Sequence, residues 1–186
     1  TITVNVSSTV MGVHPNTTTG VSSVESGAAG NPSNTASLTV IAPPQLTKSF
    51  FGLIGATLVA EGKLDDNARV AQYVPELKDS AFGDATVRQL LDMRTGLKYS
   101  ENYADPNAEI WSHARAGNVL PRPPGYQGPS TFYEFLQTVQ KEGEHGGNFA
   151  YKTVNTDALG WVIRRATGKS IGENLQERIW GPMGAE

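Results

Sequence analysis

Few side chains in this sequence have the chemistry of a catalytic or metal-binding group. The 186 residues include three histidines and no cysteine, which excludes a thiol nucleophile, a disulfide and a metal held by cysteine. His14, His113 and His145 are scattered, without a carboxylate at the spacing of a metal site. We therefore expect histidines at the surface or in loops, no metal ion and no other cofactor.

Charged residues are distributed unevenly along the chain. Residues 1–44 contain one charged side chain, Glu25, and many Ser and Thr, whereas all fifteen Lys and Arg lie from Lys48 onward. Solvated helices need charged faces, while strands of a sandwich can use Ser and Thr instead. We predict a mixed, mostly α chain, with a β-rich segment at residues 1–44 and a helical segment at residues 45–186.

The net charge of −3 contains both signs and forms no basic stripe. Binding to nucleic acid or to anionic lipid is therefore not expected. The longest apolar run, residues 50–60, is much shorter than the roughly 20 residues that a membrane helix needs. We expect no insertion into a membrane.

Alternating polar and apolar residues predict strands at residues 1–6 and 37–41. Two or three strands bury too little apolar surface to fold alone. Residues 31–40 resemble the last strands of an Ig-like repeat that occurs in tandem on bacterial surface proteins. This resemblance implies that residues 1–44 are a sandwich fragment and that the chain is extracytoplasmic or at the cell surface. No signal peptide is visible, so we expect a preceding segment.

From Lys48 onward the apolar residues recur with the period of helices, and caps and glycines separate the helices. The predicted helices run from Lys48 to Gly62, from Thr86 to Gly96, from Ser130 or Thr131 to Gly143, from Asp157 to Gly168, and from Ser170 to a stop at Gly181 and Pro182. Residues 99–129 are rich in Pro, Gly and Asn, and we predict a long loop there.

Several ordered blocks of the helical segment resemble class C β-lactamase-like serine hydrolases. They are Lys48-Ser49-Phe50-Phe51, residues 59–65 (VAEGKLD), 73–77 (YVPEL), 86–91 (TVRQLL) with 95–97 (TGL), 148–151 (NFAY), and 168–170 (GKS) with 175–184. Tyr103-Ala104-Asp105-Pro106 followed by Glu109 is most similar to the branch of 6-aminohexanoate-dimer hydrolases and carboxylesterases. The resemblance implies the helical part of a serine β-lactamase-like α/β fold.

The resemblance also implies acyl transfer on a small ester, amide or lactam. In the family a Ser at a helix start attacks the carbonyl, a Lys one turn later takes its proton, and a Tyr assists the leaving group. Lys48 matches the Lys and Tyr151 matches the Tyr. Thr153 stands where members carry Asn or Ser, and Asn155 is near enough to share its role. Tyr103 is expected to line the substrate pocket.

The nucleophile position of this motif holds an amide. Counting back three residues from Lys48 reaches Gln45, which cannot form an acyl-enzyme, and no other Lys has a Ser three residues before it. Losing a catalytic nucleophile costs on the order of a millionfold in turnover. The family's central sheet, third motif and oxyanion-hole N–H are also expected to be missing from this chain. We therefore expect no turnover.

Three interpretations follow from these features. The first is a truncated, joined protein: an Ig-like segment followed by an inactive remnant of an esterase, lactamase or amide hydrolase. The second is a non-catalytic binding module on a bacterial surface protein with Ig-like repeats. The third is an assembly artefact at the join between Pro44 and Gln45. Amide-cleaving members of the branch carry an acidic residue after the position of His113, so Ala114 favours ester chemistry in any intact relative.

Overall fold

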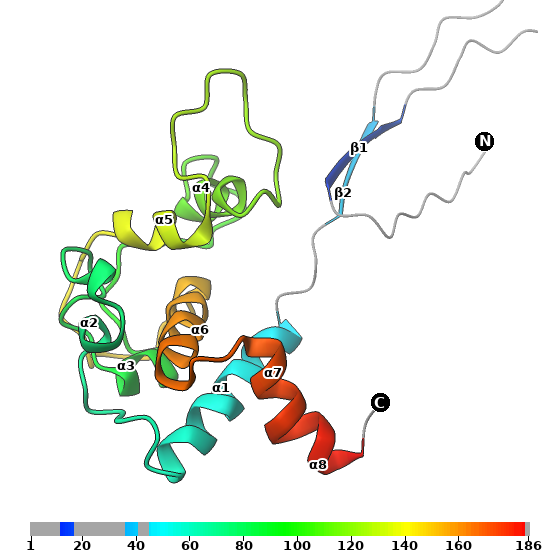
Figure 1. Cartoon of the computed structure of the whole chain (residues 1–186). Helices are drawn as coiled ribbons and strands as arrows, with labels where there is room; N and C mark the ends of the chain where they lie inside the picture. The colour runs from blue at the N-terminus through cyan, green and yellow to red at the C-terminus, as the bar shows by residue number, and fades with distance from the viewer. Residues whose placement is uncertain (1–11, 17–35, 41–44, 185–186) are drawn as a thin grey trace, which may run out of the picture.

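The computed structural model describes residues 12–16, 36–40 and 45–184, with side chains from residue 48 onward. This part of the chain is mostly helical (Figure 1). Its elements are β1 (Gly12–Asn16), β2 (Ala36–Val40), α1 (Gln45–Ala60), α2 (Val70–Tyr73), the 3₁₀-helix η1 (Pro75–Leu77), α3 (Val87–Leu91), α4 (Glu109–Ala116), α5 (Phe132–Thr138), α6 (Thr153–Thr167), α7 (Ile171–Leu175), the π-helix η2 (Gln176–Trp180) and α8 (Gly181–Met183).

The two strands form one antiparallel pair. Gly12 lies opposite Val40, and Asn16 lies opposite Ala36. The strand predicted at residues 37–41 corresponds to β2, whereas the one predicted at residues 1–6 lies outside the described residues. The prediction missed β1, which contains Pro15 and shows little alternation of polar and apolar side chains.

Helix α6 is the centre of the helical part, with α1, α2, α3, α5 and α7 packed around it (Figure 1). Ile54 and Leu58 of α1 are fully buried against this core. Helices α1 and α6 approach closely at Gly160, where a Cβ atom would lie 2.3 Å from the ring of Phe51. The buried side chains of α6 include Val154, Ala158, Leu159, Val162 and Ile163.

Capping signals in the sequence correctly located several helix ends. The hydroxyl of Thr86 accepts from the N–H of Gln89, whose own side chain accepts from the N–H of Thr86, and Ser170 forms the same capping box with Glu173. Gly62, with φ of +68°, follows the end of α1, where a left-handed residue ends a helix at little cost. These contacts fix where α1, α3 and α7 begin or end.

Several predicted boundaries were wrong. The helix that begins after Thr86 ends at Leu91 and not at Gly96, and α6 begins at Thr153 and not at Asp157. Helix α4 lies within the predicted loop, and the segment between α4 and α5 is the part that extends away from the other helices (Figure 1). Helix α5 ends at Thr138 because Val139 is extended, so it does not reach Gly143. Pro182 does not stop the last helix, because it lies in the first turn of α8, where a missing N–H leaves no bond unmade.

The helices described in this structure include none that combines the length and the apolar character needed to cross a membrane.

Candidate active site

Three residues predicted from the family resemblance meet at the start of α6. The ammonium group of Lys48, on α1, donates a hydrogen bond to the Thr153 hydroxyl at 2.8 Å and another to the Tyr151 hydroxyl. It also lies 4.1 Å from the centre of the Tyr151 ring, within the range of a cation–π contact. Tyr151 is 46% exposed, so the cluster is open to solvent. The fold therefore joins residues that lie 103 positions apart.

Gln45 is the first residue of α1, three positions before Lys48. Residues three apart on an α-helix lie on the same face, one turn from each other. The Gln45 side chain lies outside the described part of the structure. Position 45 therefore lies on the same face of α1 as Lys48, one turn earlier.

Glu101 is a further member of the site that the sequence did not indicate. Its carboxylate accepts a hydrogen bond from the backbone N–H of Thr153, the first residue of α6. A carboxylate there satisfies an otherwise unpaired N–H and interacts favourably with the helix dipole. The two residues are 52 positions apart, and no spacing rule links them. Glu101 therefore fixes the start of α6 beside Lys48.

Tyr103 lies in the segment after Glu101 and is 56% exposed. Its ring contacts Trp111 edge to face, with 5.8 Å between the ring centres. Partial burial raises the pKa of the Tyr103 hydroxyl, and the negative charge of Glu101 raises it further. Tyr103 thus keeps its proton at neutral pH.

Asn155 lies beneath the site and does not reach its surface. The side chain is fully buried, its oxygen accepts from the Thr95 hydroxyl at 2.7 Å, and its amide group donates to the Met93 sulfur at 3.4 Å. The expectation that Asn155 shares the substrate contact of Thr153 does not agree with this placement. Its polar atoms bind the segment under α6 instead.

His113 is not a surface histidine, contrary to expectation. It is 4% exposed and lies between the Tyr99 hydroxyl, 3.0 Å from Nδ1, and the Asp157 carboxylate, 2.8 Å from Nε2. Burial raises the pKa of the Tyr99 hydroxyl, so that this group keeps its proton. The contact between His113 and Asp157 ties α4 to α6.

His145 does lie in a loop, but its side chain is only 5% exposed. It binds the backbone N–H of Gly96 and the carboxylate of Asp84. Within the described ranges, no three His, Asp or Glu side chains come together as ligands for a metal ion. The side chain of His14 is outside these ranges.

Two other features do not belong to the Lys48 cluster. Residues 168–172 (GKSIG) have the spacing of a Gly-x-Ser-x-Gly nucleophile elbow, which requires a strand before the Ser. Here the segment joins two helices, and the Ser170 hydroxyl is bound to Glu173 as a helix cap.

A cavity of about 680 Å³, lined by Phe132, Asp157 and Trp161 among others, is not lined by Lys48, Tyr151 or Thr153.

Several known proteins that this chain resembles are named as hydrolases. The 6-aminohexanoate-dimer hydrolase of Paenarthrobacter ureafaciens is 36% identical over 141 residues, which make up 76% of this chain and 35% of that protein. A solved structure from Bacillus anthracis, provisionally assigned as a 6-aminohexanoate-dimer hydrolase, superposes with a TM-score of 0.67 at 31% identity. The superposition covers 89% of this chain and 44% of the Bacillus anthracis chain. The structure of a family VIII carboxylesterase has a TM-score of 0.54 at 27% identity, over 74% and 34% of the two chains.

These relatives are longer proteins, and this chain spans less than half the length of each. The family profile Beta-lactamase matches residues 9–186. This range includes β1 and β2 and does not separate residues 1–44 from the helices, so the Ig-like assignment of that segment stays a prediction. The match over nearly the whole chain and the shared fold show that this chain belongs to the β-lactamase family.

Proposed function

We propose that this chain carries the lysine–tyrosine part of an acyl-transfer site for small esters or amides, and that Gln45 leaves it without a nucleophile. The contact of Lys48 with the Tyr151 and Thr153 hydroxyls supports this proposal most directly. Relatives named as a 6-aminohexanoate-dimer hydrolase and a carboxylesterase support the class of substrate. Ala114 favours esters over linear amides, because amide-cleaving members of the branch carry an acidic residue at this position.

The proposed chemistry assigns one role to each residue. In an intact member, a neutral Lys at the position of Lys48 takes the proton of a Ser hydroxyl one turn earlier while the Ser oxygen bonds to the substrate carbonyl. Tyr151 then passes a proton to the leaving alcohol or amine as the carbonyl–leaving-group bond breaks. Water hydrolyses the acyl-enzyme and restores the Ser. Thr153 orients Lys48 by its 2.8 Å hydrogen bond.

In this chain the reaction stops before a bond to the substrate carbonyl forms. The nitrogen lone pair of a Gln carboxamide is delocalised onto the carbonyl, so Gln45 does not attack an ester. Lys48 and Tyr151 are nevertheless in contact. This combination also favours the second interpretation, a module that binds a small ester or amide without cleaving it.

The test is hydrolysis of a chromogenic β-lactam and of a short-chain nitrophenyl ester by the purified chain. A Lys48→Ala, Tyr151→Phe double variant is the matched control. We expect the same background rate from both proteins. Turnover that disappears in the double variant would contradict the proposed inactivity, while turnover that persists in it would show that the reaction occurs at another site.

Binding of an ester that is not cleaved distinguishes the binding module from an inactive remnant. Equilibrium dialysis measures how much of the intact ester each protein binds. Binding that weakens in the double variant supports the module, whereas equal or no binding by both proteins supports the remnant.

A further inference from the structure

A histidine side chain is among the contacts that attach the segment leading to Tyr151 to the rest of the site. We propose that His145, with its proton on Nε2, is a positioning residue that holds this segment in place and thereby keeps Tyr151 opposite Lys48. We call residues 140–151 the docking loop. The inference uses the proposed function only to identify Lys48 and Tyr151 as the site, and its test does not require catalysis.

The docking loop lies along residues 93–98, and the two segments are joined mainly through their backbones. A Cβ atom on Gly96 would lie 2.0 Å from the Gly143 oxygen, so the backbones touch directly at this point. The hydrogen bonds are Lys98 N–H to Gln140 O (2.8 Å), Glu142 N–H and Gly143 N–H to Gly96 O (2.9 and 3.1 Å), Gly146 N–H to Arg94 O (2.7 Å), Ala150 N–H to Met93 O (2.9 Å), and the Arg94 guanidinium to Gly146 O and Gly147 O (2.6 Å each).

His145 lies at the middle of this contact, and its neighbours determine which of its nitrogens carries the proton. The backbone N–H of Gly96 points at Nδ1 from 3.0 Å, and a backbone N–H can only donate. Nδ1 must therefore be an unprotonated acceptor. Nε2 then carries the hydrogen and donates to the Asp84 carboxylate at 3.0 Å. The neutral imidazole satisfies both neighbours at once.

Protonation of His145 removes this match. The imidazolium ion has an N–H at both ring nitrogens, so that two N–H groups would face each other between His145 and Gly96. The imidazole is nearly buried, and a buried N–H that loses its acceptor costs roughly 1–3 kcal/mol. Acid therefore weakens the contact that holds the docking loop.

The charged groups around His145 do not remove this conflict. Asp84 attracts an imidazolium ion, but its carboxylate is already bound to Lys141 at 2.6 Å and its side chain is 52% exposed. The hydrogen bond from Lys141, followed by the one from His145, lowers the pKa of the Asp84 carboxyl, so Asp84 stays charged well below neutral pH. Glu144 pairs with Lys141 at 3.4 Å, and the Arg94 guanidinium is bound to loop carbonyls.

Tyr151 is connected to this contact on both sides. The residue before it, Ala150, donates its N–H to Met93 O. The residue after it, Lys152, is 8% exposed and donates its ammonium group to Leu97 O and, at 3.3 Å, to Glu142. Release of the docking loop therefore moves Tyr151 relative to Lys48.

Hydrogen exchange and tyrosine NMR on the full chain test the proposal. The protection factors of the Gly96, Gly146 and Ala150 amides would be measured at about pH 7.5 and about pH 5.5, where a free histidine side chain is mainly neutral and mainly protonated, respectively. A ¹³Cζ-tyrosine label, assigned with Tyr151→Phe, reports the Tyr151 environment in the same samples. We expect protection to fall about tenfold at the lower pH, as expected for one lost hydrogen bond, and the Tyr151 signal to move with it.

Two substitutions at one position separate positioning from a general effect of acid. His145→Asn places an amide oxygen where Nδ1 accepts, without a titrating group, and should keep the protection at both pH values. His145→Ala should have low protection at both. The Val162 amide in the middle of α6 serves as the internal reference and should not change.

Protection that is independent of pH in the wild-type chain, or that falls equally in His145→Asn, would overturn the proposal. So would an unchanged Tyr151 signal in a folded His145→Ala variant. If His145→Ala does not fold, the comparison of wild type with His145→Asn decides the question. Failure of the proposed function would leave these signals unchanged, because they require no substrate.

Discussion

The ammonium group of Lys48 donates a hydrogen bond to the Thr153 hydroxyl, and this bond links the first turn of α1 to the first residue of α6. The two helices also share the apolar core that Ile54 and Leu58 enter. The site is therefore placed by the same contacts that hold the helices together. Substitutions in the site should therefore affect stability much less than substitutions in the core, because the Lys48 cluster is open to solvent while the core is buried.

Replacement of Lys48 by Met should disturb the site without unfolding the chain. Lys48 is only partly buried, so loss of its hydrogen bonds should change the free energy of unfolding by about 1 kcal/mol or less. The Tyr151 hydroxyl and ring should lose their cationic neighbour. Urea unfolding measures the first effect, and the tyrosine NMR signal measures the second. A large loss of stability with an unchanged Tyr151 signal would contradict the assigned contact.

Leu58→Ala should destabilise the chain much more than Leu53→Ala. Both residues lie on α1 and both changes remove the same atoms, but Leu58 is fully buried and Leu53 is 48% exposed. The expected costs are roughly 2–5 kcal/mol for Leu58 and within about 0.5 kcal/mol for Leu53. Equal midpoints of urea unfolding for the two variants would show that α1 does not pack as described.

Gly160→Ala should also destabilise the chain, in contrast to Gly172→Ala. A Cβ at Gly160 would lie 2.3 Å from the Phe51 ring, whereas at Gly172 the nearest atom is 3.9 Å away. Overpacking costs typically 1–3 kcal/mol, while Ala in place of an unstrained helical Gly is favourable by up to about 1 kcal/mol. Phe51→Leu should recover part of the loss in a Gly160→Ala background. Calorimetry measures the unfolding temperatures of Gly160→Ala, Gly172→Ala and the Phe51→Leu, Gly160→Ala double variant.

Helix caps and glycine stops could be read from the sequence because they depend on residues within one turn. Thr86 with Gln89 and Gly62 are such cases. The contact of Lys48 with Tyr151 was expected only from the family resemblance, because periodicity does not relate residues in different helices. Glu101 had no signal at all, since it binds a backbone N–H in a distant segment. Helix α4 was missed because Pro and Gly are frequent on both sides of it.

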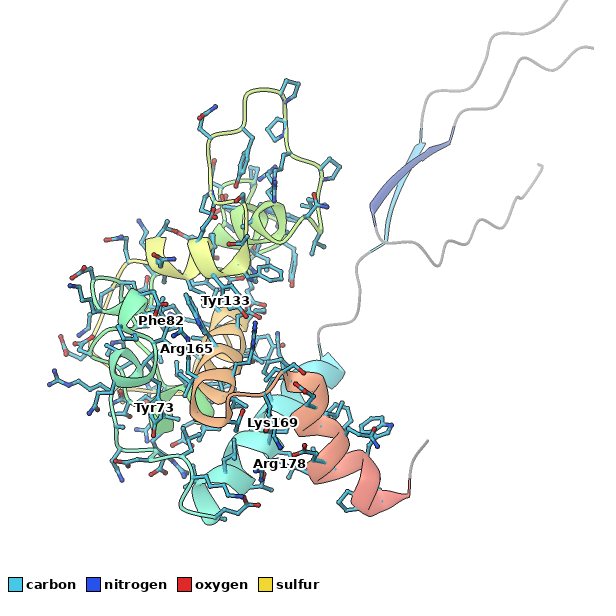
Figure 2. The ribbon with its side chains drawn as sticks, viewed as in Figure 1. Tyr73, Phe82, Tyr133, Arg165, Lys169 and Arg178 are labelled. Atoms are coloured by element: carbon cyan, nitrogen blue, oxygen red, sulfur yellow. The ribbon has the colours of Figure 1, made fainter. Side chains whose placement is uncertain are left out.

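The bond between Arg178 and Glu61 should persist in acid. Figure 2 shows Arg178 on the last helical run, beside α1, and its guanidinium lies 2.8 Å from both oxygens of Glu61. Mainly through this bond, and with help from Lys63, the pKa of the Glu61 carboxyl falls from 4.5 to about 2. A lowered carboxyl pKa stabilises the fold above the unfolded value of 4.5, and this contribution is lost as the pH falls toward about 2.

An NMR titration of the Glu61 carboxyl carbon measures this pKa directly. In Arg178→Gln, which keeps a polar side chain without charge, the midpoint should return toward 4.5. Salt at high concentration should raise the wild-type midpoint as well, because both groups are partly exposed and the attraction is screened. A wild-type midpoint near 4.5 would contradict the contact of Arg178 with both oxygens of Glu61.

The most direct test of the account restores the nucleophile. The Gln45→Ser variant would be treated with a fluorophosphonate probe, which labels activated serines, and compared by intact mass with wild type and with a Gln45→Ser, Lys48→Ala variant. We expect one added probe on Gln45→Ser, mapped to residue 45, and none on the other two proteins. The probe tests the attack by the serine alone, and we do not expect Gln45→Ser to restore turnover of an ester. Equal labelling of Ser at position 45 with and without Lys48, or labelling of the wild-type chain, would contradict the claim that Lys48 is the base of a site whose nucleophile is missing.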